Sequence, residues 1–189
     1  MDYGTHAGSR ASGIIRSILS WAFFFVSVLA LIWLIQNFVA RAYAIPSGSM
    51  EDTIEIGDQV WSEKISYYLR EPAYGDIITF DDPEIPGRTL IKRVIATPGQ
   101  TVDLIDGVVY VDGTPLDEPY TDGKPSVPLD AANDVSITYP YTVPAGSLWV
   151  MGDNRTSSSD SRYFGPIKKS SVSGRAFVVY WPLTHLGVL

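Results

Sequence analysis

The chain has 189 residues, a length that fits one domain together with a membrane anchor. Its formal net charge of −7 argues against a nucleic-acid partner. The sequence contains no cysteine, which excludes disulfides, thiolate metal sites and a cysteine nucleophile. Two histidines are too few for a histidine-rich metal site, and a Ser-His-Asp triad would depend on His185 alone, since His6 lies near the N-terminus.

The N-terminal region predicts a membrane anchor. Residues 1–16 are rich in glycine and serine and are expected to form a short cytoplasmic tail. Residues 17–40 carry no charge and exceed the ~20 apolar residues that a helix needs to cross a bilayer. Arg10 and Arg16 favour a cytoplasmic N-terminus, although Arg41 weakens this positive-inside signal. We therefore expect a single-pass protein of the cell membrane, with its remaining residues, 41–189, outside the cytoplasm.

An alternative is a cleavable leader, because Ala42-Tyr43-Ala44 has the Ala-x-Ala pattern of a signal-peptide cleavage site. The apolar run is longer than the ~7–15 residues of a typical signal-peptide core. Cleavage after Ala44 would also leave the next segment, which carries candidate catalytic residues, at a loose new N-terminus. These two arguments favour a retained anchor.

Residues 45–53, Ile-Pro-Ser-Gly-Ser-Met-Glu-Asp-Thr, could present a nucleophile. Pro46 fixes one backbone angle, and Gly48 permits a turn that a side chain would block. Of the two serines that flank this glycine, one could attack while the other donates a hydrogen bond. An ordinary Pro-Ser-Gly turn after an anchor explains the same residues, and taken alone they favour that simpler interpretation.

The remainder reads as mainly β, without a long amphipathic helix beyond Ala40. Asp106-Gly107 predicts a hairpin turn between two strands, and residues 116–144 predict a long irregular surface excursion. The predicted strands are residues 59–62, 77–80, 89–96, 102–105, 108–111, 147–151 and 175–181.

A candidate base lies in the strongest predicted strand, residues 89–96. Strand alternation places Lys92 on the same face as Leu90 and Val94, where it could be buried. Burial lowers the pKa of a lysine from ~10.4 by up to ~3–5 units, and a neutral amine can accept a proton from a serine. A lysine at the sheet edge whose amine reaches water is the other reading, and the strand alone leaves both open.

Residues 151–165 are dense in hydrogen-bonding groups. A solvated loop accounts for their serines, but not readily for Asp153-Asn154-Arg155 followed by Asp160-Ser161-Arg162. Acids and arginines at this spacing indicate a loop that is held by charge-assisted hydrogen bonds.

Four blocks now stand in order after the apolar segment: residues 45–50 (IPSGSM), 75–80 (GDIITF), 90–99 (LIKRVIATPG) and 151–165 (MGDNRTSSSDSRYFG). Together they resemble the bacterial type I signal peptidases, which are membrane-bound endopeptidases with a Ser-Lys dyad. The resemblance implies a mainly β protein, with a single N-terminal transmembrane helix followed by a β-rich signal-peptidase-type catalytic domain.

The resemblance also implies roles for individual residues. Ser49 would be the nucleophile and Lys92 the general base, which later serves as the acid for the leaving amine. The backbone N–H of Ser49 and the hydroxyl of Ser47 would form the oxyanion hole, and Ser158 would hydrogen-bond the amine of Lys92. No metal or cofactor is implied. Three further residues would support the site: Asp153, Asp160 and Arg162.

The chain departs from the family pattern at two places. The family commonly has proline where this chain has Asp52, just before Thr53, and often has Asp-Asn where this chain has Thr156-Ser157. Neither change removes an expected catalytic group. The substrates implied are preproteins cut after Ala-x-Ala-like sites, whose small side chains need shallow apolar pockets and whose extended backbone can pair with a strand edge.

Three other classes of protein are alternatives to this family. A penicillin-binding or β-lactamase-like acylase needs Ser-x-x-Lys, and no lysine here has a serine three residues before it. The apolar segment argues against a soluble self-cleaving repressor with a Ser-Lys pair. A membrane-anchored β-domain that binds a partner without catalysis predicts that Ser49→Ala and Lys92→Ala leave function intact.

Overall fold

The computed structural model describes residues 7–132 and 134–189, and the chain divides into two compact units, Met1–Val39 and Ala40–Leu189. The first unit contains helix α1 (Ala7–Leu34) and the π-helical turn η1 (Ile35–Val39). Its stretch Gly13–Leu34 is exposed and is long and apolar enough to cross a membrane, a test that a signal sequence also passes.

Helix α1 begins before the predicted boundary at Ser17, so the tail expected for residues 1–16 is helical from Ala7 onward. Residues 1–6, which include His6, lie outside the described residues. Alanine and arginine are good helix formers, and helix propagation is cooperative, so the apolar helix extends into this polar stretch.

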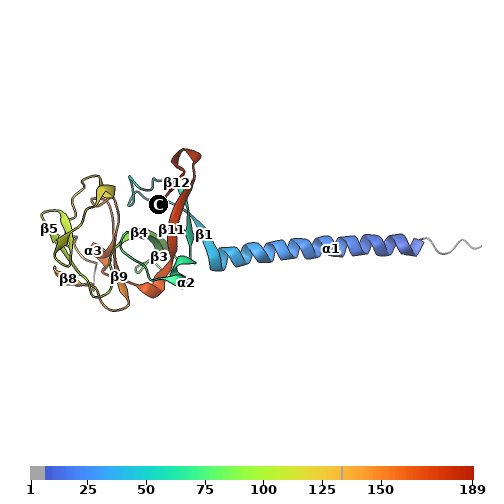
Figure 1. Ribbon diagram of the computed structural model, residues 1–189, viewed down its shortest axis with the longest axis horizontal. Helices are drawn as coiled ribbons and strands as arrows, with labels where there is room; N and C mark the ends of the chain where they lie inside the picture. Colours follow the sequence, from blue (N-terminus) through green and yellow to red (C-terminus); the bar gives the residue numbers. More distant parts are fainter. Residues whose placement is uncertain (1–6, 133) are drawn as a thin grey trace, which may run out of the picture. The chain divides into compact units, whose positions relative to one another are not determined.

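The second unit is built around one large antiparallel sheet, with the order β1-β2-β11-β3-β4-β9-β10 and with β12 paired to β11 (Figure 1). Its strands are β1 (Ala40–Ala44), β2 (Gln59–Glu63), β3 (Ile77–Asp81), β4 (Thr89–Ala96), β9 (Ser147–Met151), β10 (Ile167–Lys168), β11 (Val172–Trp181) and β12 (Gly187–Val188).

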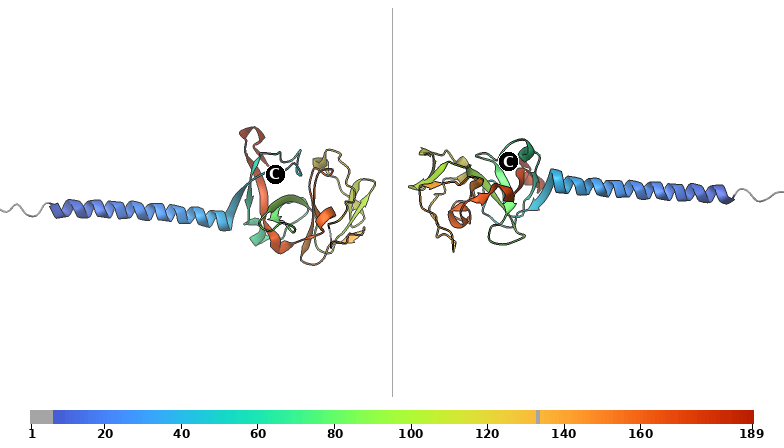
Figure 2. Two further views of the ribbon diagram at one scale, coloured as in Figure 1. Left: turned by 180° about the vertical axis from the view of Figure 1, so that it is seen from behind. Right: turned by 90° about the horizontal axis from the view of Figure 1, so that it is seen from below.

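A smaller sheet has the order β7-β6-β5-β8, with β5 (Thr101–Ile105), β6 (Val108–Val111), β7 (Thr114–Pro115) and β8 (Tyr141–Thr142). Asp106 and Gly107 join β5 to β6 with φ values of 51° and 83°, which confirms the predicted Asp-Gly hairpin. Figure 1 and both views in Figure 2 place the smaller sheet at one end of this unit, away from β1 and β11.

Short helical elements complete the second unit: α2 (Ser66–Leu69), η2 (Pro119–Thr121), α3 (Ser161–Phe164), η3 (Lys169–Ser171) and η4 (Leu183–His185). None exceeds one turn or so, which confirms the mainly β assignment. The predicted excursion, residues 116–144, contains only η2 and β8 as regular elements among its described residues.

The core consists of three apolar clusters, and β4 contributes to each of them. Ile91 packs against the cluster around Met50 and Val60, Val94 belongs to the cluster of the sheet centre, and Ile95 belongs to the cluster around Trp149. A strand held from three directions has little freedom to move, because protein interiors are closely packed. Strand β4 is therefore a rigid support for the side chains between these anchors.

Candidate active site

The turn that follows β1 fixes the candidate nucleophile. Ile45 is buried, its N–H donates to the carbonyl of Asp58 at 2.9 Å, and its own carbonyl accepts from the N–H of Gly57 at 2.9 Å. Met50 is fully buried next to Ser49, so the chain is anchored on both sides of the turn. At Gly48 an added Cβ would meet the carboxylate of Glu51, so a larger residue there would require the Glu51 side chain to move.

Ser49 and Lys92 meet beneath the surface, although 43 positions separate them in the chain. Nζ of Lys92 lies 2.6 Å from Oγ of Ser49 and also donates to the carbonyl of Ile91 at 3.0 Å. Lys92 is 3% exposed and Ser49 is 8% exposed. Of the two readings left open by the sequence, the structure favours the buried lysine over one that reaches water.

The surroundings of Lys92 favour its neutral form. Burial is the main cause and lowers the pKa of Lys92 to about 8, while the negative charges of Asp160 and Asp153 oppose this shift. A group with a pKa near 8 is present in both protonation states close to neutral pH, which is what proton transfer in both directions requires.

The first supporting group is Asp153, which is fully buried at the end of β9. Its carboxylate accepts hydrogen bonds from Nε and Nη2 of Arg93, at 2.8 and 2.5 Å, and from the hydroxyl of Thr53 at 2.6 Å. Asp153 thus ties β4 to the turn that carries Ser49.

The second supporting group is the pair of Asp160 and Arg162, both fully buried. Nε and Nη2 of Arg162 each donate to Asp160 at 2.9 Å, and the N–H of Gly152 donates to Asp160 at 3.0 Å. Ser158 donates to Asp160 at 2.8 Å, whereas its expected hydrogen bond to Lys92 stays a prediction.

Gly152 explains how closely this loop approaches the nucleophile. A Cβ at this position would collide with the hydroxyl of Ser158 and with the backbone carbonyl of Ser49. The two segments therefore pack backbone against backbone, which only glycine permits.

Two residues of the same loop matter more than their sequence pattern indicated. The side-chain amide of Asn154 donates to the carbonyl of Gly48 at 2.9 Å and to the carboxylate of Glu51 at 3.0 Å. Arg155 is buried and makes a bidentate pair with Glu118, at 2.6 and 2.8 Å. The run Asp-Asn-Arg signalled a held loop, but Glu118 lies in the excursion and carried no signal of its own.

At position 52, where the chain departs from the family pattern, the backbone has a conformation that proline does not allow. Asp52 has a φ of 77°, which proline cannot adopt because its ring holds φ near −65°. The carboxylate of Asp52 forms an ion pair with Lys124 of the excursion. The turn of this chain thus differs in backbone shape from one that has proline at this position.

Two adjoining cavities open onto the Ser49–Lys92 pair. One, of about 280 Å³, is lined by Ser47, Gly48, Glu84, Ser157, Ser159 and Phe164 among others. The other, of about 170 Å³, is mostly apolar and is lined by Ala44, Ile45, Pro46, Ser47 and Leu90 among others. Within the described residues, neither the N–H of Ser49 nor the hydroxyl of Ser47 has a hydrogen-bond partner, so both remain able to bind a ligand oxygen.

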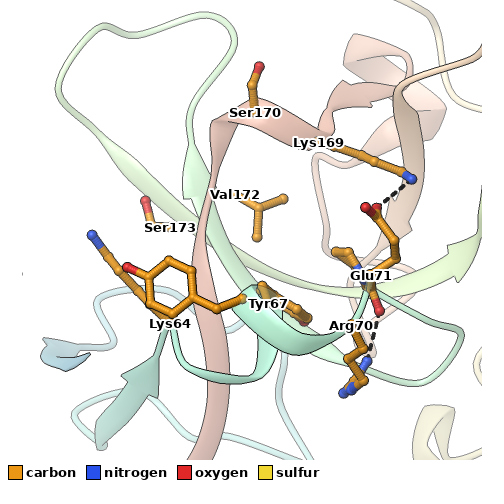
Figure 3. A pocket seen from close by; sticks show the side chains of 10 residues that line it. Lys64, Tyr67, Arg70, Glu71, Lys169, Ser170, Val172 and Ser173 are labelled. Carbon is orange, nitrogen blue, oxygen red and sulfur yellow. Dashed lines mark hydrogen bonds and ion pairs between the residues drawn. The ribbon is translucent and has the colours of Figure 1, made fainter. Parts of the chain in front are cut away.

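A further cavity of about 410 Å³ lies elsewhere, between α2 and the start of β11 (Figure 3). Two of its basic side chains already have partners, since Lys169 pairs with Glu71 at 2.6 Å and Arg70 pairs with Asp76 at 2.6 Å. Neither Ser49 nor Lys92 lines it, so it is separate from the candidate active site.

Residues 18–181 match the family model described as "Signal peptidase, peptidase S26". A probable signal peptidase I-1 of Synechocystis is 41% identical over 168 residues, covering 85% of this chain and 81% of that protein. Signal peptidase I of Leptolyngbya laminosa is 40% identical over 162 residues, covering 82% of this chain and 75% of that protein.

A solved structure of a signal peptidase I from Enterococcus faecalis is 34% identical and has a TM-score of 0.44. The match covers 56% of this chain and 97% of that one.

Proposed function

Because the chain belongs to the signal peptidase family, peptidase S26, and is a serine endopeptidase, we propose that it removes signal peptides with a Ser-Lys dyad formed by Ser49 and Lys92. The main support for this proposal is the 2.6 Å distance between Nζ of Lys92 and Oγ of Ser49. This amine is buried, and within the described residues it has no hydrogen bond to a carboxylate.

The proposed reaction begins with proton transfer from Oγ of Ser49 to neutral Nζ of Lys92. Oγ attacks the scissile carbonyl, and the N–H of Ser49 and the hydroxyl of Ser47 stabilise the resulting oxyanion. When the tetrahedral intermediate collapses, the protonated Lys92 gives its proton to the leaving amine, and an acyl-enzyme remains on Ser49. Water then attacks the ester with Lys92 again as base, which releases the signal peptide and restores the hydroxyl.

The supporting residues act on this dyad by holding the turn that carries Ser49 against β4, which carries Lys92. Asp153 links β4 to the nucleophile turn, while Asp160 and Arg162 hold the loop that packs against the carbonyl of Ser49. We further propose that Ser158 orients the amine of Lys92 when substrate is bound, although its hydroxyl donates to Asp160 here.

The proposed cleavage site is Ala-x-Ala-like, and the smaller cavity supports this preference. Its 170 Å³ and its mostly apolar lining suit small side chains, and it lies directly beside Ser49. An extended substrate between residues 44–47 and 88–92 would place every second side chain toward this cavity.

Helix α1 supports a membrane location for the proposed enzyme. Its exposed apolar stretch, Gly13–Leu34, would cross the cell membrane once, with a cytoplasmic N-terminus and the catalytic unit, Ala40–Leu189, on the outer side. The lipid bilayer and the preprotein would then be the two partners of the enzyme.

Labelling tests the dyad directly. The purified full-length protein is treated with an acylating peptidase inhibitor, and the modified residue is mapped by mass spectrometry. We expect modification at Ser49 and cleavage of a preprotein whose signal ends in Ala-x-Ala, with both lost in Ser49→Ala. Modification at another serine, or normal cleavage by Ser49→Ala, would contradict Ser49 as the nucleophile. The absence of both labelling and cleavage in the unmodified protein would instead support the non-catalytic partner-binding domain.

A further inference from the structure

Arg88 stands at the dyad but has no part in the chemistry proposed above. It lines both cavities that open onto Ser49 and Lys92. Among the residues that line the smaller cavity, Lys92 and Arg88 alone are ionisable, and Lys92 is needed as the base. Arg88 is thus the fixed positive charge of an otherwise mostly apolar cavity.

The loop between β3 and β4 holds Arg88 in place through Asp82. The Asp82 carboxylate is buried and accepts from the N–H groups of Glu84 and Ile85, at 2.8 and 3.2 Å, and from Nε of Arg88. The backbone closes the same loop, because the N–H of Asp82 donates to the carbonyl of Arg88 at 2.9 Å. The guanidinium therefore has a defined position without a direct contact to the dyad.

The outer part of the guanidinium is available to a ligand. Only Nε bonds to Asp82, and within the described residues Nη1 and Nη2 of Arg88 have no hydrogen-bond partner. The Arg88 side chain is 48% exposed, so a substrate can reach it. Arginine presents these two nitrogens in a planar fork that matches a carboxylate.

We propose that Arg88 is a specificity-determining residue, which favours an acidic side chain and disfavours a basic one at the middle position of the Ala-x-Ala site. This inference rests on the proposed function. If the alanines face the small cavity, the middle side chain points outward from it toward solvent, where the half-exposed side chain of Arg88 at that cavity can reach it. The buried carboxylate of Asp82 offsets part of the Arg88 charge through Nε, but Nη1 and Nη2 keep their N–H donors for a substrate carboxylate.

The test compares three preproteins that differ only at the middle residue, which is glutamate, glutamine or lysine. For the unmodified full-length enzyme we expect kcat/KM to fall in that order, with about tenfold between glutamate and lysine, because exposed charge pairs are individually weak. Arg88→Gln should reduce this ratio to about one, and Arg88→Lys should keep most of it. High salt should also lower the ratio for the unmodified enzyme.

Lys169→Gln is the matched control, because it removes the same charge at the cavity of Figure 3 and should leave the ratio unchanged. A ratio that is the same in Arg88→Gln as in the unmodified enzyme would overturn the role of Arg88. So would an Arg88-dependent preference found only on the C-terminal side of the scissile bond. Failure of the proposed function looks different, because the glutamine preprotein would then not be cleaved, or Ser49→Ala would cleave it.

Discussion

Two consecutive residues of β4, Lys92 and Arg93, carry the same formal charge on opposite faces of one strand, and their environments are opposite. Within the described residues, the hydrogen bonds of the Lys92 amine go to a hydroxyl and a carbonyl, and burial lowers its pKa to about 8. Burial alone would also lower the pKa of Arg93, but its hydrogen bonds to Asp153 raise that pKa above the ordinary value.

The difference explains how one strand can serve both the proposed catalysis and the stability of the fold. On the face of Arg93, a fully buried carboxylate fixes the cation in its charged form and joins β4 to β9. Asp160 and Asp153 are near enough to influence the Lys92 amine, but within the described residues neither forms a hydrogen bond with it. The chain therefore keeps one amine free to exchange protons by directing its carboxylates to arginines.

The largest effect is expected from Lys92→Arg, which keeps the positive charge but removes the possibility of a neutral base. Because arginine stays protonated in proteins, we expect kcat/KM to fall by about 10⁴ or more, as when a triad member is lost. The measurement is cleavage of an Ala-x-Ala preprotein at pH 8. Activity within tenfold of the unmodified enzyme would contradict the role of Lys92 as base.

The second-largest effect concerns stability, and it distinguishes the face of β4 that carries Arg93 from the face that carries Lys92. Asp153→Asn leaves Arg93 without its buried partner and should lower the free energy of unfolding by about 3–5 kcal/mol. Lys92→Met should not destabilise the fold near pH 7, because the lowered pKa means that the native state disfavours the protonated amine there. The unfavourable contribution of Lys92 to the free energy of folding is fully present below pH 8, and it disappears as the pH rises toward the pKa of this lysine in the unfolded chain. Denaturant unfolding of both variants measures the contrast, and equal losses would refute it.

The pH dependence of the unmodified enzyme follows from the same lysine. About half of Lys92 is neutral at pH 8 and about one hundredth at pH 6, so kcat/KM should fall roughly fiftyfold between these two pH values. Above pH 8 the rate should level off. A profile that is flat across this range in a buffer series of constant ionic strength would exclude a base with this pKa.

The smallest effect is expected from loss of the hydrogen bond between Thr53 and Asp153, which links the turn that carries Ser49 to the partner of Arg93. Thr53→Val removes the hydroxyl that donates to Asp153 and should cost about 1.5–3 kcal/mol of stability, the usual value for a hydrogen bond to a charged group. The turn that carries Ser49 is held elsewhere, so kcat/KM should drop no more than about tenfold. Thr53→Ser retains the hydroxyl and serves as the control, and an effect equal to that of Thr53→Val would assign the loss to packing.

Much of this arrangement was predictable because it follows from local patterns. Strand alternation placed Lys92 with Leu90 and Val94, and β4 has the predicted bounds, Thr89–Ala96. The Asp-Gly turn was equally direct, because few residues tolerate a positive φ.

Other features depend on contacts between distant segments and could not be predicted in this way. Strand β1 was missed because Ala40–Ala44 is extended only by pairing with β2. The partners of Arg155 and Asp52, Glu118 and Lys124, lie in an excursion whose own sequence predicts no regular structure. Arg88 was overlooked because it lies in a loop with two prolines, and its position depends on the buried carboxylate of Asp82.

The pairing of β1 with β2 has a consequence for the lifetime of the protein. Ala42-Tyr43-Ala44 would suit an enzyme of the proposed specificity. However, Tyr43 packs against the core, and Ile45, the next residue after the motif, is buried with both backbone groups bonded. Another copy of the enzyme could cleave the bond between Ala44 and Ile45 only after β1 had separated from β2. The folded protein is in this way protected from cleavage by other copies of itself, and the protection lasts as long as β1 stays paired with β2.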